Sequence, residues 1–295
     1  MPCLRFASIR DVGLIATSFT SQFKQFMTLV ARSGVTEGAR IVIRELGLRT
    51  HQSVAYPRLG RRFVVEFDPV WRWIEKGVRE PGVLKFAQDR VGRGSTVFDV
   101  GAHVGEWTLL FSELVGPSGR VVAFEPDPVA RASLKKNLGM NGISNVTVEE
   151  KCVSDKTGKA LLRAERFGSG LSSIVRPRGR GGGYDELEVE ATTLDEYCET
   201  HALYPDWIKI DAEGSEPLIV RGMQRVIEER HPQAILEFHS DGLTDQEKGE
   251  AWSTVTKQAS GVEFLQSRVR NHVYLERLSE GYVPDCGFLV VHVAY

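Results

Sequence analysis

The sequence predicts an α/β fold in which a mostly parallel sheet carries helices on both faces. Short apolar runs of strand length, such as Val97–Val100 and Val121–Phe124, alternate along the chain with longer segments of helical spacing. The runs are apolar at nearly every position, as is typical of strands buried on both faces of a parallel sheet. This alternation builds strand–helix–strand units, whose strands lie parallel and whose helices cover the sheet.

Residues 1–62 differ from the remainder, and we expect them to form a helical N-terminal extension or cap. Apolar residues at helical spacing predict one helix over Phe19–Val30 and a shorter one over Glu37–Leu46. The main domain is expected over residues 63–295. It begins with a short strand at Phe63–Phe67.

Strands and helices are expected in alternation through the main domain. The predicted helices are Val83–Val91, Trp107–Leu114, Asp127–Leu138, Leu194–Thr200 and Pro217–Glu229. The predicted strands are Val97–Val100, Val121–Phe124, Val146–Val148, Lys151–Val153, Ala160–Arg163, Leu187–Ala191, Trp207–Asp211, Ala234–Phe238 and Phe288–Val293, the last as an antiparallel edge strand.

The turn after Val97–Val100 is the most informative feature of the chain. Gly101 and Gly105 remove side chains where the backbone approaches a ligand or other backbone closely, and the helix that follows offers free N–H groups to an anion. Glu125 ends the next strand, about 20 residues on, where a carboxylate usually holds a ribose diol. We expect a branched side chain at Gly101 to block cofactor binding and to leave the fold largely intact. The alternative is an ordinary strand–glycine–helix connection.

The glycine spacing excludes the commonest nucleotide motifs. In a dinucleotide fingerprint, glycines would stand at the positions of His103 and Glu106. The phosphate-binding pattern G-x-x-x-x-G-K-[ST] does not occur. A nicotinamide cofactor is therefore not expected.

Polar residues follow two later strands. Asp211 and Glu213 come at the end of one predicted strand, and Glu237 and His239 lie on or just after the next. Open α/β sheets bind ligands at the carboxyl ends of their strands, so these side chains are candidates for chemistry. The ordinary pKa of histidine, near 6.5, suits a proton acceptor at neutral pH. A structural histidine is the alternative.

Two charged residues near these candidates, Glu216 and Lys209, have structural explanations. Glu216 stands before Pro217, where negative charge stabilises a helix start. Lys209 lies inside an apolar strand, so it must find a carboxylate partner.

We expect no resident metal. The set that would otherwise hold a divalent cation consists of Asp211, Glu213, Glu237 and His239.

The segment 166–184 is rich in glycine and arginine and interrupts the alternation. A surface loop is the simplest interpretation. The alternatives are a lid over the active site or an arginine-rich contact for an anionic substrate. Nucleic-acid binding is only weakly supported, because few aromatic residues are interleaved with the arginines.

The composition limits the partners. The 295 residues carry a formal net charge of −2, which gives no overall field to attract nucleic acid or an anionic membrane. No apolar run reaches the ~18 residues of a membrane-spanning helix, and no signal peptide is recognised, so we expect a cytoplasmic protein. The four cysteines show no C-x-x-C spacing, which favours reduced thiols.

The chain resembles the FkbM family of S-adenosylmethionine-dependent methyltransferases. The block Ile-Lys-Ile-Asp-x-Glu-Gly, beginning at Ile208, is the most discriminating part of this resemblance. His103 departs from the family, which usually has Asn there. The segments that carry the resemblance are Phe98–Gly105, Val122–Pro128 with Asn137 and Asn141, Thr193–Asp195 and Ile208–Glu216, with Val153–Asp155 and Ser172–Ser173.

The resemblance implies a Rossmann-like class I methyltransferase fold with a seven-stranded sheet, and S-adenosylmethionine as cofactor. It also implies O-methylation of a hydroxyl on a small molecule, such as a sugar or natural product, and a homodimer is left open. The residues expected to bind the cofactor are Asp99, Gly101, His103, Gly105, Glu125, Asp155 and Asp211. Those expected in catalysis are His239, Glu213 and Asp211.

Two other functions remain open at this point. Methylation of nitrogen often uses an Asn/Asp-Pro-Pro-Tyr motif after the fourth strand, whereas residues 211–214 read Asp-Ala-Glu-Gly. A catalytically inactive cofactor-binding protein that acts through a partner is the third candidate.

Overall fold

The protein is described by a computed structural model that covers residues 51–56, 59–66, 81–165, 172–175, 184–241, 243–267, 276–277 and 288–295. The chain divides into two compact units, Met1–Gln52 and Ser53–Tyr295. The helices predicted over Phe19–Val30 and Glu37–Leu46 lie outside the described residues, so the helical extension stays a prediction.

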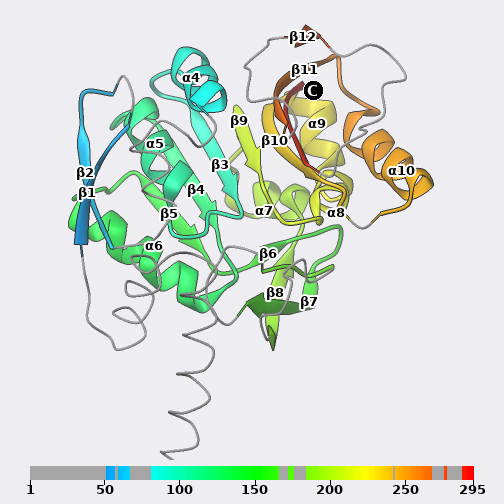
Figure 1. Ribbon diagram of the computed structural model, residues 1–295, viewed down its shortest axis with the longest axis horizontal. Coiled ribbons are helices and arrows are strands. Elements are labelled where there is room, and N and C mark those ends of the chain that lie inside the picture. Colours follow the sequence, from blue (N-terminus) through cyan, green and yellow to red (C-terminus); the bar gives the residue numbers. More distant parts are fainter. Residues whose placement is uncertain are drawn as a thin grey trace, which may run out of the picture. The chain divides into compact units, whose positions relative to one another are not determined.

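The main sheet contains eight described strands in the order β12-β11-β13-β10-β9-β3-β4-β5 (Figure 1). Strands β5, β4, β3, β9 and β10 are parallel to one another. Strand β13 is antiparallel to β10 and β11, and the two-residue β12 is an antiparallel edge strand. The strands are β3 Thr96–Val100, β4 Arg120–Phe124, β5 Val146–Glu149, β9 Trp207–Ile210, β10 Gln233–His239, β11 Gly261–Ser267, β12 Glu276–Arg277 and β13 Phe288–Ala294.

The helices cover the two faces of this sheet in separate groups. Because side chains alternate along a strand, Val97 and Phe98 of β3 point into different hydrophobic cores. The core around Val97 contains helices α4 (Pro81–Arg90), α5 (Glu106–Val115) and α6 (Pro128–Met140). The core around Phe98 contains helices α7 (Leu194–His201), α8 (Glu216–Arg221), α9 (Gln224–Arg230) and α10 (Asp245–Thr256). The predicted mostly parallel α/β sheet is confirmed.

Two small sheets accompany the main one. Strands β1 (His51–Ala55) and β2 (Arg62–Glu66) form a pair, and β2 is held to α6 by Asn137, whose side-chain oxygen accepts from the Glu66 amide at 2.7 Å. Strands β6 (Cys152–Val153), β7 (Gly158–Glu165) and β8 (Tyr184–Thr192) form a three-stranded sheet in the order β6-β8-β7.

Three details differ from the sequence expectation. The helix predicted over Pro217–Glu229 is two helices, α8 and α9, separated at Gly222, where a Cβ would lie 2.1 Å from the Ser154 carbonyl oxygen. The loop between β6 and β7 therefore lies close against Gly222, where the two helices are separated. Strand β13 lies between β10 and β11 rather than at the edge, because β11 and β12 continue the sheet beyond it. Helix α10 and strands β1, β11 and β12 were not predicted.

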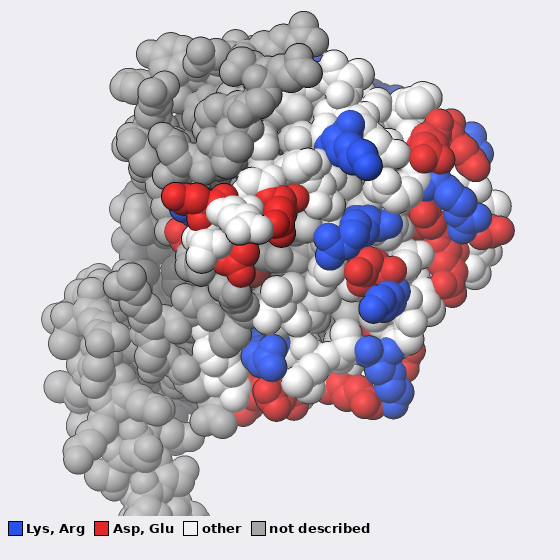
Figure 2. Space-filling view, turned by 90° about the vertical axis from the view of Figure 1, so that its right-hand side faces the viewer, with Lys and Arg blue, Asp and Glu red and all other residues white. Residues whose placement is uncertain are grey.

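Charged side chains of both signs lie on the face of the molecule that Figure 2 shows. Lysine and arginine are interspersed with aspartate and glutamate over the described part of the face in Figure 2. Within the described ranges, every helix is too short or too polar to cross a bilayer.

Candidate functional site

The turn between β3 and α5 has a strained backbone that two glycines make accessible. Gly101 and Gly105 have φ angles of 81° and 96°, in the left-handed region that favours glycine. His103, between them, adopts φ 50° although it has a side chain. Its amide N–H donates to Glu125 Oε2 at 2.7 Å, so the position that departs from the family pattern is held through its backbone.

Gly101 is required by a contact within the protein. A Cβ there would lie 1.8 Å from the backbone oxygen of Asp211, which follows β9. A Cβ at Gly105 would likewise lie 2.6 Å from Leu134 Cδ1 of α6. The expectation that a branched residue at position 101 leaves the fold largely intact is therefore wrong, because the first atom that it adds enters the neighbouring backbone.

Glu125, at the carboxyl end of β4, is buried against the same turn. Its Oε2 accepts from the His103 amide and its Oε1 accepts from the Asp127 amide at 2.9 Å. Burial raises the pKa of Glu125 to about 7, and the two amide donors oppose this shift. The N-cap of α6 is Asp127, which accepts from the Val129 and Ala130 amides. The N-terminus of α6 is therefore capped by Asp127 and not by Glu125. Each carboxylate oxygen of Glu125 keeps one further lone pair that can accept a hydrogen bond.

Asp99 is fully buried on β3, below the turn. Its Oδ2 accepts from the Thr108 hydroxyl of α5 at 2.6 Å. Its Oδ1 is buried and has no hydrogen-bond partner among the described residues. Burial raises the pKa of Asp99, and Lys209 and the Thr108 hydroxyl act against the increase.

Lys209 and Asp211 bring charge to the adjacent strand β9. Lys209 is opposite Asp99 in the parallel register, so both side chains leave the same face of the sheet. Its ammonium group contacts Asp211 Oδ2 at 3.0 Å while the lysine is only 3% exposed. The expected carboxylate partner is therefore found. Burial alone would lower the pKa of Lys209, but Asp211, Asp99 and Glu237 raise it.

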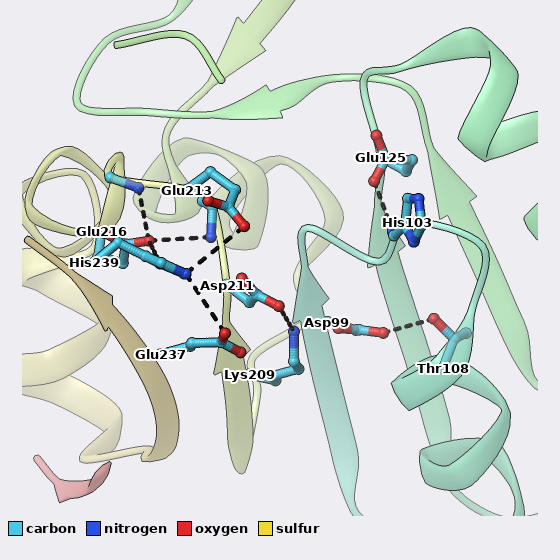
Figure 3. A network of polar contacts seen from close by, with 12 residues as sticks. Asp99, His103, Thr108, Glu125, Lys209, Asp211, Glu213, Glu216, Glu237 and His239 are labelled. Carbon is cyan, nitrogen blue, oxygen red and sulfur yellow. Dashed lines mark hydrogen bonds and ion pairs between the residues drawn. The ribbon is translucent and has the colours of Figure 1, made fainter. Parts of the chain in front are cut away.

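Glu237 and His239 lie two residues apart on β10 and hence on one face. Three carboxylates, from Glu213, Glu216 and Glu237, converge on the imidazole of His239. Nδ1 lies 2.9 Å from Glu216 Oε1, and Nε2 lies 3.5 Å from Glu237 Oε1 and 3.7 Å from Glu213 Oε1 (Figure 3). His239 is 5% exposed and Glu216 is fully buried, so these charges interact in a desolvated environment.

The surrounding carboxylates change the ionisation of His239. Burial by itself would lower the pKa of His239, but the negative charges of Glu216, Glu237 and Glu213 raise it well above 6.5. The pKa of Glu237 is also raised, by burial and by Asp211. The prediction based on an ordinary histidine pKa therefore does not apply to this ring, because the neighbouring carboxylates favour its protonated form.

Glu216 is the functional residue that the sequence reasoning missed. It is the first residue of α8, but its carboxylate turns back and Oε1 also accepts from the Ala212 amide at 3.2 Å and the Gly214 amide at 3.0 Å. It therefore fixes both the loop after β9 and the ring of His239. The signal available in the sequence was an acidic residue shortly after a glycine turn at the carboxyl end of a strand.

Asp155 is separate from this network of contacts. Its carboxylate lies 3.5 Å from Arg221 of α8, and it is partly exposed. Two serines of the glycine- and arginine-rich segment do reach the site. The Ser172 hydroxyl donates to Asp127 Oδ2 and the Ser173 hydroxyl donates to the Glu213 backbone oxygen, both at 3.0 Å. The described part of this segment, 172–175, therefore contacts both the loop after β4 and the loop after β9.

The structure thus brings together most of the predicted residues at the carboxyl ends of β3, β4, β9 and β10. Glu125 and His103 lie on one side in Figure 3, and the carboxylates around His239 lie on the other. The contact between Gly101 and the Asp211 backbone joins the two sides. Such an arrangement can bind a cofactor on one side and move a proton on the other.

The chain is similar to a family model and to curated proteins that are described as methyltransferases. A family model described as the methyltransferase FkbM domain matches residues 99–280. The 31-O-demethyl-FK506 methyltransferase FkbM of Streptomyces tacrolimicus is 28% identical over 173 residues, which cover 50% of this chain and 66% of the relative. The 2-O-methyltransferase NoeI of Sinorhizobium fredii is 26% identical over 140 residues, covering 43% and 56%. The matches therefore span less than two thirds of either relative.

Among solved structures, methyltransferase FkbM from Methylobacillus flagellatus KT is similar at 16% identity and a TM-score of 0.43. The similarity covers 68% of this chain and 43% of that chain.

Proposed function

We propose, since the chain belongs to the methyltransferase FkbM domain family, that it transfers a methyl group from S-adenosylmethionine to a hydroxyl of a small molecule. The observation that carries this proposal is the contact between Gly101 and the Asp211 backbone. This contact supports the proposal because the turn that we expect to bind the cofactor lies directly beside a cluster of titratable groups. The names of the two curated relatives also specify methylation at oxygen.

The residues around the turn fit this cofactor. Glu125 has lone pairs left for two ribose hydroxyls, and a charge-assisted bond to each is stronger than a neutral one. The buried Oδ1 of Asp99 has no hydrogen-bond partner among the described residues and can accept one more donor. Helix α5 begins after Gly105 without a side-chain cap, and the positive end of its dipole favours a negatively charged group of a ligand. S-adenosylmethionine supplies a methyl group already activated by its sulfonium charge.

The cluster after β9 and β10 is assigned to the acceptor. Transfer to oxygen needs alignment of the hydroxyl and a group that takes its proton. Because the neighbouring carboxylates raise the pKa of His239 and so make it a weaker proton acceptor, we assign this role to Glu213. Its side chain is 15% exposed and its oxygen lies 3.7 Å from His239 Nε2. In this assignment Asp211 orients the reacting groups and Lys209 balances its charge.

The proposal is tested by binding and by turnover with the full chain. Isothermal titration with S-adenosylhomocysteine is expected to show one site, and titration with NADH none. Incubation with methyl-labelled S-adenosylmethionine and a panel of sugars and hydroxylated natural products is expected to label oxygen in at least one acceptor. Binding of NADH without binding of S-adenosylhomocysteine would overturn the cofactor. Label found only on nitrogen acceptors would overturn the reaction.

A further inference from the structure

We infer that Asp211, Glu237 and His239 form a binding site for one divalent metal ion of the Mn²⁺ type. The sequence reasoning expected no resident metal, so this inference departs from it. It also goes beyond the proposed function, since cation binding can be measured without any methyl transfer.

The geometry of the three side chains is the first argument. One ligand atom from each residue lies within 4.8 Å of the other two, so a single ion can contact all three. Asp211 follows β9, and the other two residues lie on one face of the adjacent β10. Two of the donors therefore lie on a strand, which positions ligands more firmly than a surface loop does, and the third directly follows the neighbouring strand.

The second argument is the state of Glu237. Its side chain is only 9% exposed, and its contact with His239 Nε2 is 3.5 Å long. Within the described part of the chain, the side chain of Glu237 makes no shorter hydrogen bond or ion pair. A charge-assisted hydrogen bond is normally 2.7–2.9 Å. Since buried charges are usually paired or coordinate metals, this carboxylate has the environment of a ligand.

The orientation of His239 gives the third argument. Glu216 holds Nδ1 at 2.9 Å, which leaves Nε2 directed at Glu237 and Glu213. Metal-bound histidines commonly have their second nitrogen held by a carboxylate in this way. Binding of the ion at Nε2 replaces the proton on that nitrogen, which is released to solvent.

The donor set indicates the kind of ion. Carboxylate oxygens suit Mg²⁺, Ca²⁺ and Mn²⁺, whereas an imidazole nitrogen suits transition metals. Mn²⁺ accepts both, and three protein donors leave positions for oxygen ligands. If the proposed function holds, a hydroxyl bound there would lose its proton more readily because the ion stabilises the alkoxide. His239 would then act as a ligand, and Glu213 would remain the proton acceptor.

The test is a titration of the full chain with Mn²⁺ in the absence of cofactor. Binding is monitored by electron paramagnetic resonance, as the loss of the signal of the free ion. Wild type is expected to bind one ion. The variants Asp211→Asn, Glu237→Gln and His239→Gln are each expected to weaken binding at least tenfold. Glu216→Gln is expected to weaken it 10- to 100-fold, as loss of an orienting carboxylate typically does.

Two control variants separate this site from general negative charge. Glu213→Gln removes a carboxylate next to the same ring and is expected to keep Mn²⁺ binding. Glu263→Gln removes the partner of a different histidine, His292, whose Nδ1 lies 3.0 Å from Glu263 Oε2, and is also expected to keep it. Equal loss in all variants, or no binding by wild type, would overturn the inference.

A measurement on wild type alone covers the case in which a ligand variant does not fold. Substoichiometric Mn²⁺ is expected to broaden the proton resonances of the His239 ring before those of His292. Broadening of both to the same degree would overturn the site. Failure of Mn²⁺ binding with intact binding of S-adenosylhomocysteine would reject this inference and leave the proposed function standing.

Discussion

Glu125 connects the cofactor turn to the strand that follows it, and its ionisation makes a prediction at the scale of one residue. Burial raises its pKa to about 7, and ribose hydroxyls need the ionised form as acceptor. We expect the affinity for S-adenosylhomocysteine to increase as the pH rises from 6 to 8, by up to about tenfold per pH unit below the pKa. Isothermal titration at several pH values measures this.

The variant Glu125→Gln supplies the control for that titration. It is expected to bind about 10- to 100-fold more weakly at pH 8, the range for hydrogen bonds to a charged group, and to show little dependence on pH. In the free protein the raised pKa means that stability contributed by protonated Glu125 is fully present below pH 4.5 and lost as the pH rises through about 7. A steep pH dependence that persists in Glu125→Gln would assign it to another group.

The acceptor side gives a second prediction for single residues. Glu213→Gln and His239→Ala are each expected to lower turnover, by about 10²- to 10⁴-fold where proton transfer is lost, with little change in affinity for S-adenosylhomocysteine. Steady-state kinetics on an identified acceptor, beside titration of the same samples, separates the two quantities. Glu263→Gln serves as the unaffected variant. Full activity in both acceptor-side variants would show that alignment alone is sufficient.

Individual site residues were predictable to the extent that they ended a recognisable strand. Glu125, Asp211 and His239 each end or directly follow an apolar run, so their convergence at one edge of the sheet follows from parallel topology. Glu216 was assigned to the helix start because its local pattern is that of a first-turn acid. Only the fold shows that its carboxylate turns back toward His239.

At the scale of elements, the close approach of the two loops predicts the effect of adding a side chain. Gly101→Ala is expected to destabilise the protein and to weaken cofactor binding, because its Cβ would lie 1.8 Å from the Asp211 backbone oxygen and φ is positive. Gly139→Ala, within α6, has nothing within 4 Å of the added Cβ. It is expected to leave stability unchanged or to raise it by about 0.5–1 kcal/mol.

Denaturant unfolding of both variants, with S-adenosylhomocysteine titration, distinguishes the two positions. Similar stability of Gly101→Ala and wild type would mean that the loop containing Asp211 can move away without loss of stability.

Helix α10 was not predicted, although Thr244 and Glu247 form a capping box at its start, a signal that the sequence does contain. The break between α8 and α9 could not be predicted, because it depends on the approach of Ser154 from a distant part of the chain.

The whole molecule allows a prediction about thermal stability. A ligand that binds only the folded state stabilises it by about 2.7 kcal/mol at 100 times its Kd. For a unit of this size we expect S-adenosylhomocysteine at that concentration to raise Tm by roughly 5–10 °C. Scanning calorimetry or a dye-based melt measures the shift, with NADH at the same concentration as control. An equal shift with both compounds would contradict a selective cofactor site.

The centre of the sheet was predictable at this scale because β3, β4, β9 and β10 are largely apolar and buried on both faces, and such runs stand out from helical spacing. The order of the antiparallel strands was not. Placing β13 between β10 and β11 depends on pairing between segments far apart in sequence, which local patterns do not encode.

The contact between Gly101 and the Asp211 backbone has a consequence for how new acceptors could be accommodated. If the proposed cofactor binds at this turn, lengthening or bending the loop whose carbonyl contacts Gly101 is expected to disturb the methyl donor. Changes in acceptor preference are therefore expected to arise elsewhere, through the side chains of that loop and through the segment around Ser172 and Ser173 that contacts it from outside. Engineering of selectivity would begin by varying that segment while keeping the backbone of residues 211–214 unchanged.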